Sequence, residues 1–598
     1  MCIVVLARYR GQLILAKVVL STLNAKFIHS SLALRYLRAA ISKNHHVKVL
    51  EYTIHDPIDL MVADIFEEEP DVIGLSCYIW NIEQLEKLIP LLRKVLPDVF
   101  ILLGGPEVAY DAKFYMDKLP EVDAVAIGEG EELLNDLLHA LHQQSPVSSV
   151  LGLCYREQGR IIFSGARAIV SLEHLPTPYP DALMGELNQR VVYYEASRGC
   201  PFTCQYCLSS IEENVRYFPL PRVLNDLGRL ISSHVKQINF VDRTFNLKKE
   251  YAMAVFSFLA QTEGETTFHF EITGDVLHPE LVEWLVNHAP LGKFRFEVGV
   301  QSTNQLANRA VKRRQNFDKL AATVQKIKSS GKIHQHLDLI AGLPYEDYGS
   351  FRKSFNDVYQ LGPDELQLGF LKLLRGTNLR AESEKYGYIA MDRSPYEVLS
   401  NNFLSYKDLI RLKRLEDILE KYYNSGRFKH LVAYITQACF ETAFDFYQSF
   451  GDYWHDQGWS RIGHQPLDLV NRLRVFLQFA GVWDEISYAL LRVDYTLSEK
   501  QRPRRLFWRH GLEEHEQDRW LKSHQEELIA LFPELTDDFR LINIAKRVVI
   551  ERIPREAFLQ LQTDMYVVKC TADEWTAGTL LFLFPSVSGT PRIFGWTS

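Results

Sequence analysis

Apolar, strand-like runs alternate with amphipathic helices in two separate series, and this alternation constrains the fold more than any other feature. The first series precedes residue 149, with strand-like runs at 16–21, 47–52, 71–78, 99–105 and from 123 onward. The second starts at residue 191 with VVYYEAS and continues through QINFVD, TFHFEIT, FRFEVGVQS, IHQHLDLIAGL and ELQLGFLKLL. Apolar strands joined by such helices are typical of parallel sheets that helices cover. The sequence therefore predicts an α/β protein.

Changes of pattern divide the chain, because 598 residues exceed the size of a single core. We predict a doubly wound (Rossmann-like) parallel sheet over 1–148 and a linker with a small hairpin over 149–190. A partial β/α barrel should occupy 191–380, with its chemistry at the carboxyl ends of the strands. Residues 381–598 carry long helical patterns and predict a mainly helical domain, with two or three short strands near the end that include MYVVKC and TLLFLFP.

Three of the eight cysteines lie in one loop that directly follows the first strand of the second series. Cys200, Cys204 and Cys207 have the spacing CxxxCxxC. Three thiolates at this spacing can hold three irons of a [4Fe–4S] cluster and leave the fourth iron open to a small molecule. A zinc site would need a fourth ligand, which no second CxxC pair supplies, and a disulfide framework does not suit eight cysteines in so long a chain. We predict a catalytic metal cluster.

The cysteine loop and the strands that follow it resemble the radical S-adenosylmethionine (SAM) enzymes. The resemblance implies that the open iron binds SAM and that electron transfer into the sulfonium releases a 5′-deoxyadenosyl radical. It also implies reduced flavodoxin or ferredoxin as the electron donor. Tyr206, before the last cysteine, matches an aromatic residue that lies near the adenine in that family, although it could also simply pack the loop.

The same resemblance assigns further cofactor-binding residues at the strand ends of the barrel. These candidates are Asp242 for the methionine amino group, Glu271, Glu297 and Gln301 for the ribose or the methionine moiety, and Gly342 and Pro344 for the adenine. Each has a structural alternative. Asp242 could cap a helix that begins near Asn246, and the buried carboxylates could pair with each other inside the barrel, since a buried charge is costly without a partner.

Three glycine-containing turns follow strands of the first series, at 74–76, 104–107 and 128–131. Small residues there allow close approach to a ligand, although tight turning alone could explain each one. Together they resemble the cobalamin-binding domain that precedes many radical SAM cores, with Ser76, Gly104 and Gly105 lining the pocket for the nucleotide tail. The DxHxxG motif is absent and His29 does not match its spacing, so the resemblance implies that the lower face of the cobalt lacks a histidine.

Net charge and the length of the apolar runs limit the classes of binding partner that we expect for the protein. A net charge of −8 argues against a broad nucleic-acid footprint, and the longest apolar runs are shorter than a membrane span. The amino-terminal residues lack the small-residue cleavage site of a signal peptide. We therefore expect a cytoplasmic enzyme that acts on a small molecule, and an oxygen-sensitive cluster would favour anaerobic conditions.

Several functions stay open. The leading prediction is a cobalamin-dependent radical SAM methyltransferase that acts on an unactivated centre. A cyclase or rearrangement enzyme of the anaerobic Mg-protoporphyrin ester cyclase type has the same domain order. A methylthiotransferase would need three more cysteines in the first domain, where only Cys2 and Cys77 occur, and a non-catalytic iron–sulfur module would not need the barrel. Residues 381–598 resemble an uncharacterised extension, with Cys439 and Cys570 expected to be buried structural thiols.

Overall fold

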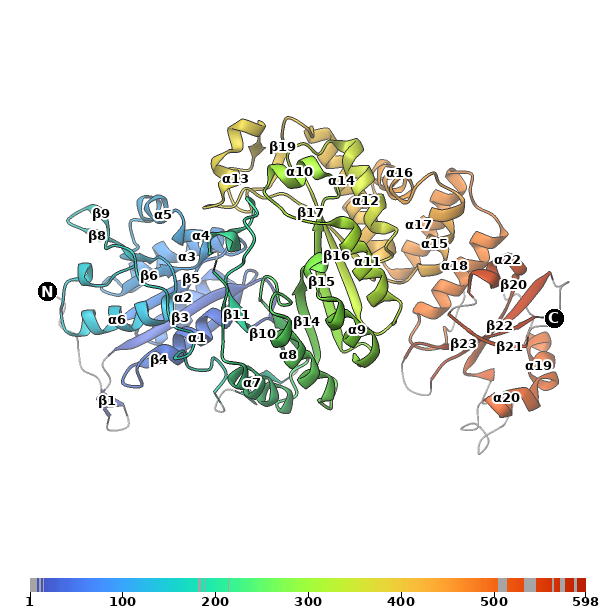
Figure 1. Ribbon diagram of the computed structural model, residues 1–598, viewed down its shortest axis with the longest axis horizontal. Coiled ribbons are helices and arrows are strands. Elements are labelled where there is room, and N and C mark those ends of the chain that lie inside the picture. Colours follow the sequence, from blue (N-terminus) through green and yellow to red (C-terminus); the bar gives the residue numbers. More distant parts are fainter. Residues whose placement is uncertain are drawn as a thin grey trace. The chain divides into compact units, whose positions relative to one another are not determined.

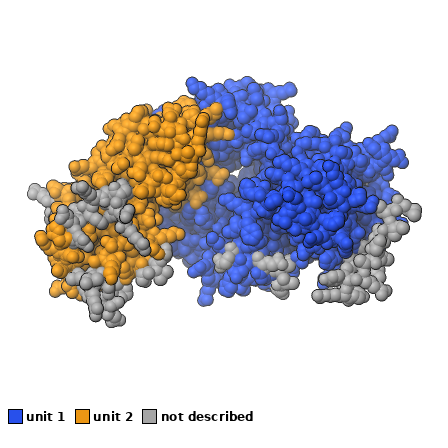
Figure 2. Space-filling view, turned by 180° about the vertical axis from the view of Figure 1, so that it is seen from behind, with its two compact units in different colours: residues 1–363, 368–409 blue, residues 364–367, 410–598 orange. Residues whose placement is uncertain are grey.

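The computed structural model describes residues 8–9, 12–13, 16–180, 184–185, 187–188, 190–212, 214–503, 514–531, 545–561, 564–569, 576–585 and 589–597 (Figure 1). The chain forms two compact units (Figure 2). The first comprises residues 1–363 and 368–409, and the second comprises residues 364–367 and 410–598. Among the described residues, every helix is too short or too polar to cross a membrane.

The first unit begins with a seven-stranded sheet in the order β4-β3-β5-β6-β7-β8-β9. Its strands are β3 (Lys17–Asn24), β4 (His46–Thr53), β5 (Val72–Ser76), β6 (Phe100–Gly104), β7 (Ala124–Ala126), β8 (Leu153–Glu157) and β9 (Arg160–Phe163). The five predicted strands, β3 to β7, are parallel. The predicted hairpin, β8 and β9, extends this sheet, since β8 pairs antiparallel with β7. Leu153, Cys154 and Tyr155 of β8 are buried, whereas the residues of β9 are half-buried or exposed. A short pair, β1 (Arg8–Tyr9) and β2 (Gln12–Leu13), precedes the sheet.

Helices cover both faces of this sheet, which confirms the doubly wound arrangement. On one face, Ile73 and Ile101 pack against α2 (Ile58–Glu67), α3 (Ile82–Val95) and α5 (Ala112–Lys118). On the other face, Leu20 and Leu102 pack against α1 (Leu32–Ala40) and α6 (Gly130–His142). Successive residues of a strand point to opposite faces, so continuous apolar strands fill both cores. The short α4 (Pro106–Ala109) follows β6.

A six-stranded sheet, in the order β10-β13-β14-β15-β16-β17, follows in the first unit, although residues 365–367 of β17 are assigned to the second unit. The strands β10 to β16 are parallel. Its strands are β10 (Val191–Tyr194), β13 (Gln237–Phe240), β14 (Thr267–Ile272), β15 (Phe294–Gln301), β16 (His334–Ala341) and β17 (Glu365–Phe370). The helices that follow are α7 (Leu220–Ser232), α8 (Lys249–Gln261), α9 (Pro279–His288), α10 (Gln305–Ala310), α11 (Phe317–Lys328), α12 (Tyr348–Tyr359) and α13 (Asn378–Ala381). All six predicted strands are present. β10 and β17 are the edges, so the barrel is partial.

The second unit is mainly helical, as predicted, but its closing sheet is larger than expected. The helices are α14 (Tyr406–Leu419), which starts in the first unit, α15 (Lys429–Ala438), α16 (Ala443–Asp456), α17 (Pro466–Phe479), α18 (Glu485–Ser498), α19 (Glu514–Ser523), α20 (Gln525–Leu531) and α22 (Arg555–Gln560). Four strands, β20 (Val548–Pro554), β21 (Tyr566–Lys569), β22 (Ala577–Leu583) and β23 (Arg592–Thr597), form a mixed sheet. Cys439 is half-buried rather than buried, and Cys570 lies outside the described residues.

Candidate active site

The cysteine loop is closed at its base by two short antiparallel strands, β11 (Ser197–Arg198) and β12 (Arg216–Tyr217). Arg198 and Arg216 are register partners, so the chain leaves and returns at one point. Gly199 has a φ of +94°, and a Cβ there would lie 2.3 Å from the carbonyl oxygen of Asn214. Only glycine satisfies both conditions. The RGC sequence therefore fixes how the loop leaves its base.

All three predicted cluster ligands are free thiols on this loop. Cys200 and Cys204 are buried, and Cys207 is half-buried. Burial raises the pKa of both the Cys200 and Cys204 thiols, and the neighbouring thiol of Cys207 adds a smaller increase. Within the described segments, no three His, Cys, Asp or Glu side chains converge as in a preformed mononuclear metal site. A cubane cluster gives each cysteine its own iron, so the three thiols suit three of its corners.

Arg313 is a site residue that the sequence did not single out. Its Nη1 lies 4.0 Å from Cys204 Sγ and 3.3 Å from the Tyr206 hydroxyl, and its Nη2 donates to the carbonyl of Gly299. In the sequence it stands in the basic run KRRQ, which reads as a solvated turn. Only the fold brings this guanidinium to the cysteine loop.

Asp242 lies directly behind the cysteine loop, where both of its carboxylate oxygens are occupied. One accepts the backbone N–H of Ala196 at 2.9 Å, and the other accepts the Ser197 hydroxyl at 2.5 Å. Burial raises the pKa of Asp242 to about 7. It does not cap a helix, because the next helix, α8, has Lys248 at its N-cap. Asp242 thus holds the segment that leads into the loop.

The carboxylates on the inner face of the barrel pair with basic side chains. Glu271 and Glu297 are register partners on β14 and β15. Glu297 Oε2 lies 2.9 Å from His269 Nε2, and Glu271 Oε1 accepts from Arg243 Nη1 at 3.3 Å. Burial raises the pKa of Glu271 to about 7, whereas the hydrogen bond with His269 lowers the pKa of Glu297. The two carboxylates therefore differ in proton affinity.

Gln301 ends β15 with a φ of +68°, an uncommon conformation for a residue with a side chain. Its buried Oε1 has no hydrogen-bond partner among the described residues. Such an acceptor is costly unless a ligand meets it, so Gln301 suits a ligand with hydroxyl donors. The other two candidates are part of the frame: Gly342, with a φ of +104°, has a carbonyl that accepts from Tyr388 and Asn401, and Pro344 is buried.

A cavity of about 640 Å³ lies beyond the carboxyl ends of the first sheet, where ligands of such sheets bind. Ser76, Gly104 and Gly105 all line it. A Cβ on Gly105, whose φ is +107°, would lie 2.5 Å from the carbonyl oxygen of Cys77, so this wall needs glycine. The volume and the glycine wall fit a bulky ligand tail such as that of cobalamin.

Residues of the barrel close the other side of this cavity. The lining includes Tyr193, Glu195 and Arg243 from the strand ends of the second sheet, and Arg198 from β11 at the base of the cysteine loop. His29 also lines it, with its Nδ1 2.9 Å from the Tyr193 hydroxyl, and burial lowers the pKa of this imidazole. The cavity therefore lies between the two sheets of the first unit. One of its lining residues, Arg198, is two residues before Cys200, the first cysteine of the loop.

Comparisons with known proteins agree with this geometry. Three family models match: the B12 binding domain over residues 18–138, the radical SAM superfamily over 194–358, and a protein of unknown function, DUF4080, over 384–568. They confirm the resemblance drawn from the cysteine loop and the glycine turns. The domain boundaries predicted above stay predictions.

Among relatives, a cobalamin-dependent radical SAM methyltransferase, TokK of Streptomyces tokunonensis, is 26% identical over 58% of this chain and 54% of its own length. An anaerobic magnesium-protoporphyrin IX monomethyl ester cyclase of Rubrivivax gelatinosus is 23% identical over 64% of this chain and 77% of its own length. The chain spans about half the length of three curated relatives that it matches, namely 51%, 54% and 47%.

The fold is also that of a solved radical SAM protein. The structure of OxsB, a cobalamin-dependent SAM radical enzyme with aqua-cobalamin and SAM bound, matches with a TM-score of 0.58 at 15% identity. The match covers 89% of this chain and 83% of OxsB. With a B12 binding domain before its cysteine loop and a DUF4080 domain after its barrel, the chain is a cobalamin-binding-domain-containing member of the radical SAM superfamily.

Proposed function

We propose that this protein cleaves SAM reductively at a [4Fe–4S] cluster held by Cys200, Cys204 and Cys207. We further propose that it uses cobalamin in the cavity of the first sheet to methylate a small molecule at an unactivated centre. One observation carries the proposal. The cavity is lined both by the glycine turns of the B12 binding domain and by Glu195 and Arg198, which lead directly into the cysteine loop. Two cofactors held there would be neighbours.

When bound, the cluster supplies the electron that splits the sulfonium to give a 5′-deoxyadenosyl radical, and cobalamin supplies a methyl carrier. The residues of the chain would bind and orient SAM. Gln301 Oε1, a buried acceptor without a partner among the described residues, would accept a ribose hydroxyl. The Arg313 guanidinium, 4.0 Å from Cys204 Sγ, would bind the carboxylate of the methionine moiety. Tyr206, Gly342 and Pro344 would flank the adenine.

The geometry of Asp242 favours a positioning role over the direct contact expected from the sequence. Its two oxygens already accept hydrogen bonds from Ala196 and Ser197, which precede the loop. Glu271 and Glu297 keep part of their side chains accessible, 33% and 35%, on the inner face of the barrel. They are therefore better suited than Asp242 to contact SAM or the substrate.

The test is anaerobic reconstitution of the purified protein with iron, sulfide, cobalamin and SAM, with reduced flavodoxin or ferredoxin as the electron donor. We also propose that the protein acts in the cytoplasm, whose reducing environment suits such a cluster. We expect 5′-deoxyadenosine as a product. Replacement of Cys200, Cys204 and Cys207 by alanine should abolish both iron binding and SAM cleavage. Full iron content and continued cleavage in that variant would refute the proposal.

A second function has a specific observation in its favour. The cyclase of Rubrivivax gelatinosus aligns over a larger share of this chain, 64%, than TokK does, 58%. The products separate the two functions, because each methyl transfer from SAM leaves S-adenosylhomocysteine. Its formation beside 5′-deoxyadenosine would support methylation, and 5′-deoxyadenosine alone would support cyclisation or rearrangement.

A further inference from the structure

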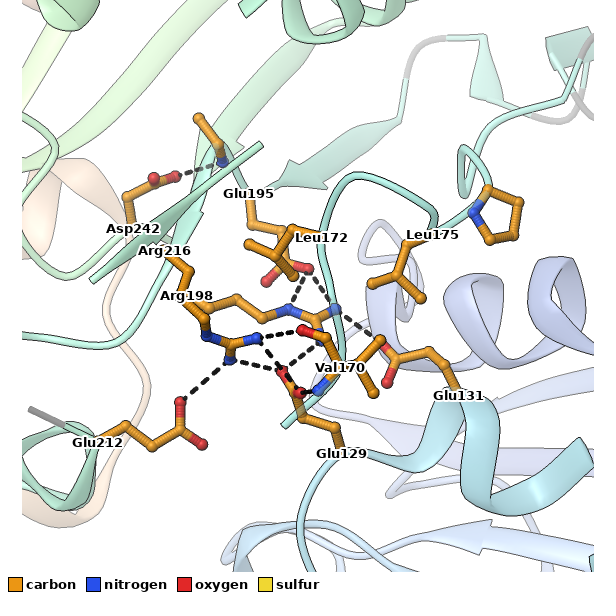
Figure 3. Close-up of polar contacts among 12 residues, drawn as sticks. Glu129, Glu131, Val170, Leu172, Leu175, Glu195, Arg198, Glu212, Arg216 and Asp242 are labelled. Carbon is orange, nitrogen blue, oxygen red and sulfur yellow. Dashed lines mark hydrogen bonds and ion pairs between the residues drawn. The ribbon is translucent and has the colours of Figure 1, made fainter. Parts of the chain in front are cut away.

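Two arginines stand at the two ends of the cysteine loop, and both bind one carboxylate of the first domain. Arg198 Nη1 lies 2.8 Å from Glu129 Oε1, and Arg216 Nη2 lies 2.7 Å from the same oxygen (Figure 3). Because Arg198 and Arg216 are also register partners, Glu129 holds the base of the loop from one side. No other residue of the B12 binding domain, within the described residues, binds both arginines.

Glu129 is itself fixed in the wall of the cavity. It precedes α6 in the turn Gly128–Glu131, and its Oε2 accepts the backbone N–H of Val170 at 2.8 Å. Both Glu129 and Glu131 line the cavity, whereas Arg216 does not. A ligand that displaces this turn would therefore also displace the base of the cysteine loop, because Glu129 is bonded to Arg198 and Arg216.

The contacts are well shielded from water. The side chains of Arg198 and Glu129 are each 14% exposed, and that of Glu131 is 7% exposed. Arg198 Nη2 also donates to Glu131 and Glu195, each at 2.6 Å. Shielded, charge-assisted hydrogen bonds are stronger than surface ion pairs, and loss of one partner leaves a buried charge uncompensated. The turn and the loop should therefore move as one body.

We propose that Glu129, held between Arg198 and Arg216, is a positioning residue that couples the cobalamin cavity to the cluster loop. Each cofactor then raises the affinity for the other. This inference rests on the proposed function, because both cofactors must bind. Coupling between two sites is reciprocal and typically amounts to a 5- to 150-fold change in affinity.

The experiment titrates the full-length protein with hydroxocobalamin under anaerobic conditions, followed by absorbance, with the cluster reconstituted and with the iron removed by chelation. For the wild type we expect the cluster-loaded protein to bind about tenfold more tightly. Arg216→Gln removes one arm of the contact, together with the hydrogen bond from Arg216 to the carbonyl of Val170, and replaces no residue that lines the cavity. It should bring the ratio of the two dissociation constants to within about twofold. The readout is binding, so no turnover is needed.

Arg222→Gln is the matched control. Arg222 is similarly buried, 17% exposed against 22% for Arg216, but its guanidinium binds the backbone carbonyls of Leu172, Leu175 and Pro176 and pairs with Asp226 rather than with Glu129. This variant should keep the wild-type ratio. If Arg216→Gln does not fold, Glu129→Gln removes the charge and keeps the shape, and it should lower the ratio in the same way.

The outcomes separate the two proposals. Wild-type protein that binds both cofactors with a ratio near one would overturn the coupling and leave the proposed function intact. Wild-type protein that binds neither cofactor would overturn both. If Arg222→Gln loses the ratio as fully as Arg216→Gln does, general loosening explains the effect and the role of Glu129 is refuted.

Discussion

Both sheets of the first unit are built from strands that alternate with helices along the chain, but the side chains of their strands are buried to different extents. In the first sheet every residue of β5 is buried, and its apolar side chains fill the cores on both faces. In the second sheet, β15 and β16 alternate strictly between buried and half-buried residues. The buried face of this sheet is aromatic on β14 and β15 and mainly aliphatic on β16, and the other face carries ionisable groups such as His269, Glu297 and Asp338.

In the second sheet, one face of each strand packs in the core and the other face carries the reactive side chains, so residues for stability and residues for chemistry are separate. In the first sheet both faces of the strands pack in cores. The strands of the first sheet serve as a scaffold, so its ligand-facing residues, Ser76, Gly104 and Gly105, stand at strand ends and in turns. In the second sheet, neighbouring residues of one strand face opposite environments. Substitutions at adjacent positions of β14 should therefore have unlike effects, whereas the first sheet should respond mainly at its glycine turns.

The largest expected effect is on the aromatic face of β14. Phe270 is fully buried, and its ring centroid lies 4.4 Å from that of Phe240 and 4.6 Å from that of Phe245. We expect Phe270→Ala to lower the free energy of unfolding by about 3–5 kcal/mol, because it removes a buried ring and leaves a cavity. Urea denaturation measures the loss. The neighbouring Glu271→Gln should cost less than about 1 kcal/mol, and an equal cost at both positions would contradict the separation of faces.

The next effect concerns the cavity of the first sheet. Gly105→Val would force a left-handed backbone and would place Cβ 2.5 Å from the carbonyl oxygen of Cys77. We expect about 1–3 kcal/mol of strain and at least a tenfold loss in hydroxocobalamin affinity. Gly128→Ala provides the control, since its φ is +91° but a Cβ there meets nothing within 4 Å. If both variants bind hydroxocobalamin with the same affinity, the backbone conformation explains the loss, and the close approach of residue 105 to the carbonyl oxygen of Cys77 does not.

Features set by local pattern were predictable from the sequence. Periodicity located the strands of both sheets, and the spacing of three cysteines located the loop, because these signals lie within a few residues of each other. The role of β8 and β9 was not predictable in this way, since their place in the first sheet depends on pairing with β7. The strands β20 and β23, which pair with β22, were not predicted from the sequence, although the run VVIERI of β20 is rich in β-branched residues.

Contacts across long stretches of chain limited the prediction of the site. Arg313 meets Cys204 over 109 residues of chain, and Glu129 meets Arg216 over 87 residues. A single sequence contains no signal that joins such positions. Asp242 was found from its place at a strand end, but whether it contacts ligand or backbone depends on Ala196 and Ser197, which follow the neighbouring strand β10.

The smallest effect is a pH dependence on the inner face of β14. Burial raises the pKa of Glu271 from 4.5 to about 7, although Arg243 opposes the shift; Glu297, His269 and Asp338 are the other charged neighbours. The folded state therefore holds this proton more tightly than the unfolded state. The resulting stabilisation is complete below pH 4.5 and is lost as the pH rises to about 7. Since the Glu271 side chain is 33% exposed, screening by solvent should keep the change below about 1 kcal/mol.

Glu271→Gln isolates this contribution, because glutamine keeps the size of the side chain and does not titrate. Thermal unfolding of both proteins between pH 4 and 8 gives the difference in midpoint. We expect the wild type to lose stability relative to the variant between pH 4.5 and about 7, the interval set by the two pKa values, and the difference to be constant above it. A difference that does not change with pH would mean that water reaches Glu271 freely. The inner face of the second sheet would then be solvated, and the contrast with the apolar strands of the first sheet would rest on exposure rather than on buried charge.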